Sequence, residues 1–276
     1  MSAPNATADP FVQFKAMQRQ TWSGFAANEG LTTIAAGELV EFANVRQGET
    51  ALDVACGTGV VAITAALRGA RVEGLDLTPP LLERARQNAS LARVDIKFTE
   101  GDAEALPYPD ASFDVVLSQY GHIFAPRPEV VTAQMLRVLK PGGRIAFTTW
   151  PAETMPGQLF TVIAGNMPSP PPGAPVPAPS VQWGEPAIVR QRLGDAVTGL
   201  RFRREMMVVP ALSPHHLVAY FEANIGPLQK LLTSLDQTSP DRAAAVREEV
   251  RRLMIDNTRN NTLLHPYLMS MATKKR

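Results

Sequence analysis

The sequence predicts an α/β fold built on a doubly wound, largely parallel sheet. Between about residues 49 and 150, short apolar runs alternate with segments of helical periodicity. Alternation of strands and helices in this way is typical of parallel sheets with helices on both faces. The chain has 276 residues, 45% of them hydrophobic, which is enough for one large domain or for one domain with a substantial appendage.

The alternating region supplies most of the expected sheet. Strands are expected at 51–55, 71–76, 94–99, 113–118 and 144–150, and helices at 59–67, 80–92 and 128–139. Pro128 suits the first turn of its helix. Lys140-Pro141-Gly142-Gly143 is expected to form a turn, because Pro does not extend a helix and Gly allows a reversal.

The flanking segments differ in character, so we divide the chain into three parts. The first, residues 1–45, is expected to be an N-terminal helical cap with helices at 11–25 and 31–42. The second, residues 46–150, is the core, and residues 151–276 form a C-terminal part. That last part contains a proline-rich connector (167–180), strands at about 200–209 and 267–273, and a helical lid at about 213–256 with helices at 213–235 and 241–255.

Composition narrows the class of protein. With 27 basic and 26 acidic residues, the chain lacks the basic excess of a dedicated nucleic-acid binder. The single cysteine, Cys56, excludes an internal disulfide and favours a cytoplasmic setting. Residues 1–10 do not resemble a signal peptide, and no apolar stretch approaches the length of a membrane span. With four histidines and one cysteine, no metal site is expected.

The loop after the first predicted strand is the expected ligand site, because open α/β sheets bind ligands at the carboxyl ends of their strands. It reads Ala55-Cys56-Gly57-Thr58-Gly59. Gly57 and Gly59 would allow a tight turn and close approach to a ligand. These glycines also fit the dinucleotide-binding fingerprint, so they do not identify the ligand alone.

Three acidic residues help to decide whether this loop binds a dinucleotide or a different ligand. Asp53, inside the strand, would repel a pyrophosphate and favour the ammonium and sulfonium groups of S-adenosylmethionine (SAM). Asp76 ends the second strand, where an acid can accept hydrogen bonds from a ribose; the alternative is a helix cap. Asp102 follows the third strand and suits the amino group of adenine, with a plain turn residue as the alternative.

Five motifs stand in order at fitting spacings. They are Asp53–Gly59, Gly74–Thr78, Gly101–Pro107, Phe113–Val116 and Leu139–Gly143. Together they resemble the class I SAM-dependent methyltransferases, particularly the ubiquinone/menaquinone-type (methyltransferase type 11) branch, over about residues 22–150. The resemblance implies a Rossmann-like seven-stranded methyltransferase sheet with N-terminal helices and a C-terminal helical lid insertion. Residues 46–150 would then be the SAM-binding core.

The resemblance also implies roles for nine residues. Those against the methionine part of SAM would be Asp53, Ala55, Gly57, Gly59 and Ser118, with Asp53 reaching the amino group. Those against the nucleoside would be Asp76 on the ribose, Leu77 against the adenine, and Asp102 and Ala103 at the adenine edge. Ala55 departs from the pattern, because many members of the family have Gly there.

The methyl acceptor is less defined. His122 and Tyr120, after the fourth strand, are candidates for a general base, with packing or a cofactor contact as the alternative. The family usually has an apolar residue at position 122, and methyl transfer can proceed by positioning alone. Apolar and aromatic residues of the lid would suit a small apolar or aromatic acceptor if they roof a pocket, although core packing also explains them.

Two other classes of function remain open at this stage. An NAD(P)-dependent oxidoreductase would use the same glycine-rich loop. A non-catalytic SAM-binding module would bind the cofactor without an acceptor cavity. An RNA or protein acceptor is a further alternative; the neutral charge disfavours RNA, and no Asn-Pro-Pro-Tyr-type tetrad follows the fourth strand.

Overall fold

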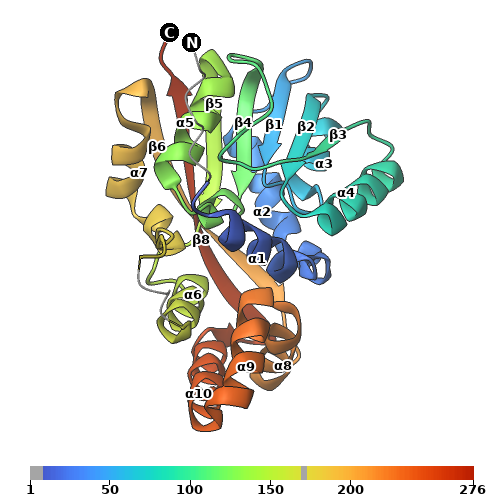
Figure 1. Cartoon of the computed structure of the whole chain (residues 1–276). Helices are drawn as coiled ribbons and strands as arrows, with labels where there is room; N and C mark the ends of the chain where they lie inside the picture. The colour runs from blue at the N-terminus through green and yellow to red at the C-terminus, as the bar shows by residue number, and fades with distance from the viewer. Residues whose placement is uncertain (1–8, 169–172) are drawn as a thin grey trace.

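The computed structural model describes residues 9–168 and 173–276. Its centre is a sheet with the strand order β3-β2-β1-β4-β5-β8-β6, and a short β7 pairs with β8. The first five strands are parallel, whereas β8 runs antiparallel to both β5 and β6. The predicted Rossmann-like seven-stranded sheet is therefore confirmed (Figure 1). The strands are β1 (Thr50–Val54), β2 (Arg71–Asp76), β3 (Lys97–Glu100), β4 (Phe113–Gln119), β5 (Leu139–Thr149), β6 (Val197–Pro210), β7 (Thr258–Arg259) and β8 (Thr262–Lys274).

Helices cover both faces of the sheet, because alternate residues of each central strand point to opposite sides. In β4, Val115 and Leu117 belong to one apolar core and Val116 to the other. The first core includes α2 (Glu29–Phe42), α3 (Val60–Leu67) and α4 (Pro79–Ala92). The second includes α5 (Pro128–Val138) and α7 (Pro186–Leu193). This two-sided burial explains the nearly continuous apolar runs of the strands.

The strand order reverses between β1 and β4, which are neighbours in the sheet. The chain moves outward from β1 to β2 and β3, then returns to the other side of β1 to form β4 and β5. A crevice opens at the carboxyl ends of the strands on either side of such a switch point. The fold thus places the loops after β1 and β4 side by side.

The C-terminal part extends beyond this edge of the sheet. The long strands β6 and β8 run past the other strands and carry α8 (Pro214–Asn224), α9 (Gly226–Thr238) and α10 (Pro240–Asp256) (Figure 1). The segment predicted as a helix at 213–235 is interrupted before Gly226-Pro227, since a proline removes a donor from a helix interior. The helix α1 (Val12–Trp22), followed by η1 (Phe25–Asn28), lies at the same edge.

Some boundaries differ from the sequence-based expectations. Residues 140–143, predicted as a turn, lie within β5: Phe113 pairs with Leu139 and Val115 with Arg144, so the intervening residues bulge from the ladder. The sequence analysis did not predict five elements: α6 (Met155–Asn166), η2 (His122–Phe124), η3 (Ser180–Gly184), α7 and η4 (Gly194–Ala196).

Part of the proline-rich connector, residues 169–172, lies outside the described residues. None of the helices in the described ranges is both long and apolar enough to span a bilayer.

Candidate active site

A cavity lies at the carboxyl edge of the sheet and has two contrasting walls. The first, which we call the acidic wall, consists of Asp53 in β1, Asp76 at the end of β2, Asp102 after β3, and the short loops that follow these strands. The second, the aromatic wall, comes from elements far apart in the sequence. It contains Trp22, Tyr120, Phe124, Trp150, Phe160 and His265.

Asp53 lies in β1, and its carboxyl group is buried with a hydrogen bond to only one of its two oxygens. The Ala62 amide in the first turn of α3 donates to Oδ2 at 3.0 Å, whereas Oδ1 has no hydrogen-bond partner in the described part of the chain. Burial raises the pKa of Asp53 to about 8, and the nearby Asp76 carboxylate adds to this effect. Asp53 lines the cavity, and an unpaired carboxyl oxygen in such a residue suits a cationic group of a ligand.

The loop after β1 turns sharply through two residues with left-handed backbone angles. Ala55 and Gly57 both have φ of +55°. A left-handed conformation costs a residue with a side chain energy that glycine avoids, which explains why the family pattern has Gly at position 55. Space for the Ala55 methyl group exists because Gly121, which lies directly against it, has no side chain. No described residue comes within 4 Å of where a side chain on Gly57 would begin, so its backbone is open toward the cavity.

Asp76 joins the end of β2 to this loop. The Gly57 amide donates to Oδ2 and the Thr78 amide to Oδ1, both at 2.8 Å. Burial raises the pKa of Asp76, although these amide hydrogen bonds oppose that shift. Each carboxylate oxygen can accept more than one hydrogen bond, so the group can still receive ligand hydroxyls. The helix-cap alternative is not realised, because the N-cap of α4 is Thr78 and Asp76 accepts from the amide of that residue, ahead of the helix.

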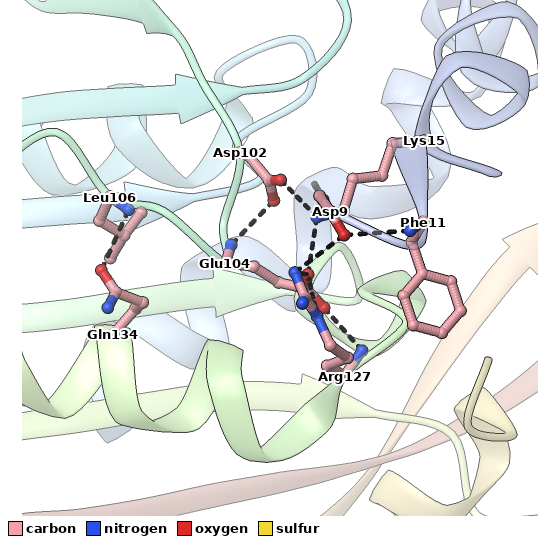
Figure 2. A network of polar contacts seen from close by, with 8 residues as sticks. All are labelled: Asp9, Phe11, Lys15, Asp102, Glu104, Leu106, Arg127 and Gln134. Atoms are coloured by element: carbon pink, nitrogen blue, oxygen red, sulfur yellow. Dashed lines mark hydrogen bonds and ion pairs between the residues drawn. The ribbon is translucent and has the colours of Figure 1, made fainter. Parts of the chain in front are cut away.

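Asp102 belongs to an ion-pair network with the N-terminal segment, shown in Figure 2. The Lys15 ammonium of α1 lies 2.6 Å from Asp102, 2.6 Å from Asp9 and 2.7 Å from Glu104. Arg127 also pairs with Glu104 at 2.6 Å. Burial alone would lower the pKa of Lys15, but its hydrogen bonds to the three acids raise it. The network holds α1 against the loop after β3, so α1 borders the acidic wall.

The three acids of this network have the proximity that a metal site requires. Lys15 already lies within 2.7 Å of each of them, in the position that a cation would take. The arrangement is therefore that of a buried ion-pair cluster, with the ammonium as the compensating charge.

Three residues predicted for the site do not line the cavity. They are Gly59, Ser118 and His122. A side chain on Gly59 would begin 3.0 Å from the Phe98 ring of β3 and 3.1 Å from Ala85 of α4, so this glycine permits close packing of the start of α3 against both elements. Ser118 is fully buried, and its hydroxyl group donates to the Val54 carbonyl oxygen at 2.7 Å. This hydrogen bond joins β4 to β1 and uses the hydroxyl proton.

His122 packs in the second core, away from the cavity. Its ring contacts Phe147 and Trp183, and Nδ1 lies 3.0 Å from the Ser118 hydroxyl. Burial, assisted by the Arg192 charge, lowers the pKa of His122 to about 3. This placement does not support the hypothesis that His122 deprotonates an acceptor, because an acceptor in the cavity would not reach it. The packing alternative fits the geometry.

Tyr120 does line the cavity, as do Asp53, Ala55, Gly57, Asp76, Leu77, Asp102 and Ala103. It has a φ of +60° and stacks on Trp150 with ring centroids 4.3 Å apart. Burial raises the pKa of Tyr120 well above its ordinary value, so the phenol keeps its proton. A neutral phenol can orient an acceptor by hydrogen bonding, but it does not serve as a base.

The rest of the aromatic wall was largely missed by reasoning from sequence. Trp150 stacks on Phe160 of α6 at 5.1 Å, and Phe124 contacts both Phe160 and Trp22. His265 of β8 also lines the cavity, 6.0 Å from Trp150 between ring centroids. Trp150 ends a predicted strand at the ligand edge, and that position was the one available signal. Nothing in the local sequence around Phe160 or His265 points to the site.

Comparison with known proteins agrees with this geometry. The family model described as "methyltransferase domain" matches residues 52–147. Uncharacterized protein Rv1403c of Mycobacterium tuberculosis is 35% identical over 237 residues, which cover 86% of this chain and 85% of that protein. Demethylmenaquinone methyltransferase of Deinococcus radiodurans is 48% identical over 114 residues, covering 40% of this chain and 47% of that one. The chain belongs to the class I SAM-dependent methyltransferase family.

Solved structures support the fold of this methyltransferase. The YcgJ protein from Bacillus subtilis has a TM-score of 0.57 at 18% identity and covers 87% of this chain and 98% of its own. Protein BH2331 from Bacillus halodurans C-125 has the same TM-score and identity, covering 87% and 99%. At this level of identity the likeness concerns the fold alone.

Proposed function

We propose that this methyltransferase transfers the methyl group of SAM to a small, apolar or aromatic molecule held between the aromatic wall and the helices beyond it. One observation carries the proposal: a single cavity joins the acidic wall to the aromatic wall. A non-catalytic SAM-binding module needs the first wall only. The second wall provides space for an acceptor next to the cofactor loop.

The residues of the acidic wall fit SAM. Asp53, whose Oδ1 has no partner among the described residues, would bind the ammonium of the methionine part, and Asp76 would bind the ribose hydroxyls. The open backbone of Gly57 and the small side chain of Ala55 allow close approach of the ligand. Lys15 is the one Lys or Arg that lines the cavity in the described part of the chain, and it is already paired with three acids, so no free cation meets the pyrophosphate of a dinucleotide and the NAD(P) alternative is not favoured.

When bound, SAM supplies an electrophilic methyl carbon whose bond to sulfur breaks as the acceptor atom forms its own bond to that carbon. The chain contributes mainly by holding the acceptor in line and by excluding water. Because His122 lies outside the cavity and the Tyr120 phenol keeps its proton, neither is placed as a base. An acceptor proton would leave to solvent or be lost before attack.

The methyl acceptors of the named relatives cannot be assigned directly to this chain. The demethylmenaquinone methyltransferases match only 40 and 41% of this chain. Much of the aromatic wall, including Phe160 and His265, lies beyond the residues that the family model matches. The acceptor therefore has to be inferred from this chain's own cavity.

The test is a screen with methyl-labelled SAM against small phenols, quinols, amines and thiols. We expect labelled product from an aromatic or apolar acceptor and none from charged aliphatic compounds. Calorimetry with S-adenosylhomocysteine, with NAD as the comparison, measures the cofactor separately. Binding of NAD without binding of S-adenosylhomocysteine would overturn the proposal.

A further inference from the structure

The helix α1 borders the cavity without burying an apolar face of its own. The residues of α1 that line the cavity are Phe14, Lys15, Gln18 and Trp22. Among the residues described for this helix, Lys15 is the one that is buried, and the buried Phe11 precedes the helix. Helices in folded proteins are usually held in place by burial of an apolar stripe. α1 is therefore attached mainly through polar contacts.

Two ion pairs attach α1 to the sheet. Lys15 and Arg19 are four residues apart, so their side chains are neighbours on one side of the helix. The Lys15 ammonium lies 2.6 Å from Asp102, and the Arg19 guanidinium lies 2.9 Å from Glu100 (Figure 2 shows the first of these pairs). Glu100 ends β3 and Asp102 follows it. Both ion pairs therefore hold α1 to the carboxyl end of the same strand.

The two ion pairs lie in different environments. The Lys15 side chain is 11% exposed and is also within 2.7 Å of Asp9 and Glu104. The side chains of Arg19 and Glu100 are each 47% exposed, and neither residue is among the described residues that line the cavity. Salt screens an exposed pair far more than a buried one. A substitution at Arg19 therefore weakens the attachment of α1 without removing a contact to a ligand.

The other end of α1 is fixed by close contacts with the lid helices. A side chain on Gly226 of α9 would begin 2.0 Å from the Thr21 carbonyl oxygen, so the two backbones touch. Beyond α1, the buried Asn28 donates to the last backbone carbonyl of α8 at 2.7 Å. Gly24, between these two contacts, has no described atom within 4 Å of where a side chain would begin. A movement of α1 would therefore start at the end that the ion pairs hold.

We propose that Lys15 and Arg19 are positioning residues that hold α1 as a gate, and that the cofactor enters and leaves between α1 and the loop after β3. The inference rests on the proposed function, since it concerns the same site. Asp102 then has two roles, because it borders the cavity and fastens the gate. Opening the gate moves the paired charges apart into solvent, where salt screens them, so higher salt favours the open position.

A gate has a kinetic signature that separates it from a ligand contact. The ligand passes in either direction only while the gate is open, so a larger open fraction raises the association and dissociation rates by the same factor. The dissociation constant, which is the ratio of the two rates, then stays the same. Loss of a direct contact to the ligand instead raises the dissociation rate and weakens the affinity.

The test measures both rates for S-adenosylhomocysteine on the full chain. Association is followed by stopped-flow tryptophan fluorescence, and dissociation by displacing labelled S-adenosylhomocysteine with an excess of the unlabelled compound. We expect both rates to rise about threefold in Arg19→Met and about tenfold in Lys15→Met. The dissociation constant of Arg19→Met should change less than about twofold. Lys97→Met is the matched control, because Lys97 forms an exposed ion pair within the sheet, with Glu73 of β2.

Ionic strength provides a second measurement on the unmodified protein. Raising the salt concentration from about 50 mM to about 500 mM should increase both rates by about threefold. The increase should be smaller in Arg19→Met, because that variant lacks the exposed ion pair that salt screens. Lys97→Met should respond to salt as the unmodified protein does.

The outcomes separate the two proposals. Failure of the unmodified protein to bind S-adenosylhomocysteine would contradict the proposed function itself. Normal binding with both rates unchanged in Arg19→Met would overturn the gate alone. So would faster dissociation of Arg19→Met without faster association, since that result indicates a lost ligand contact. If Lys15→Met does not fold, Arg19→Met decides the question, because its ion pair lies at the surface.

Discussion

The two walls of the cavity are built in opposite ways. The acidic wall comes from the carboxyl ends of β1, β2 and β3 and the short loops that follow them, and its polar groups are tied to nearby backbone amides. The aromatic wall is assembled from α1, the ends of β4 and β5, α6 and β8, which span most of the chain. The first wall depends on local geometry, and the second depends on the tertiary fold.

The difference fits two different chemical requirements. A cofactor shared by a family needs the same polar contacts in each member, and strand ends of a common sheet hold such contacts in place. An acceptor varies, so its wall can be drawn from peripheral elements without disturbing the cofactor loops. Substitutions in the two walls should therefore have separable effects.

The largest effect is expected from Asp76→Ala. The change removes both the predicted ribose contacts and the hydrogen bond that holds the Gly57 amide. At roughly 1.5 kcal/mol for each hydrogen bond to a charged group, affinity for S-adenosylhomocysteine should fall about 100-fold by calorimetry. Asp95→Ala, at an exposed position, is the control. A loss of less than about threefold would show that Asp76 has only a structural role.

Lys15→Met tests the attachment of α1 to the acidic wall. Glu104 is nearly inaccessible and would keep Arg127 as its remaining partner, while Asp9 and Asp102 would lose the buried ammonium. We expect a loss of about 2 kcal/mol in the free energy of unfolding, measured by chemical denaturation. Lys97→Met is the matched control, because Lys97 forms an exposed ion pair at 3.3 Å that contributes little. Equal losses in the two variants would argue against the network.

Asp53 should make cofactor binding release a proton. Burial raises the pKa of Asp53 to about 8, so the carboxyl is mostly protonated at pH 7, and an adjacent ammonium would favour its ionised form. Calorimetry in buffers of different ionisation enthalpy should detect a release approaching about one proton per SAM, and Asp53→Asn should abolish it. Proton release that persists unchanged in Asp53→Asn would assign it to another group.

The same shift predicts how stability depends on pH. An acid whose pKa is raised by folding stabilises the protein at pH values below its unfolded pKa, and this contribution is lost as the pH rises through about 8. The melting temperature of the protein without cofactor should therefore fall more steeply between pH 5 and about 8 than the melting temperature of the Asp53→Asn variant.

The smallest effect is expected from Ala55→Gly. Relief of the left-handed conformation at φ +55° should gain about 1–2 kcal/mol, and the greater freedom of glycine in the unfolded chain should offset about half of it. Melting temperature should rise by a few degrees. Ala62→Gly, within α3, should instead destabilise the protein by about 1 kcal/mol. A lower melting temperature for Ala55→Gly would mean that the Ala55 methyl contacts outweigh its backbone strain.

The sequence was sufficient to predict most elements of the core and the residues of the acidic wall. The regular alternation of strands and helices predicts the sheet, and residues at fixed distances from strand ends, such as Asp76, predict the cofactor contacts. His122 was misplaced for a local reason. The turn after β4 brings it back onto Ser118, four residues earlier, and so into the core next to Trp183. Sequence proximity to the ligand edge did not reveal that direction.

The aromatic wall could not be predicted because its members share no sequence spacing. His265 reaches the cavity only because β8 inserts antiparallel between β5 and β6, and Phe160 only because α6 packs beneath Trp150. These are long-range contacts, which periodicity does not encode. Trp22, from the N-terminal segment predicted to be helical, lines the cavity in contact with Phe124.

Gly226 has a consequence for how ligands leave. It starts α9 directly against the Thr21 backbone of α1, in a space that no other residue would fit. At its other end α1 carries Lys15, paired with Asp102. One helix thus borders the Asp102 side of the cavity at one end and supports the helices beyond the aromatic wall at the other. A movement of α1 that opens one side of the cavity would therefore also move the other, so we expect the residence times of the two products to be linked.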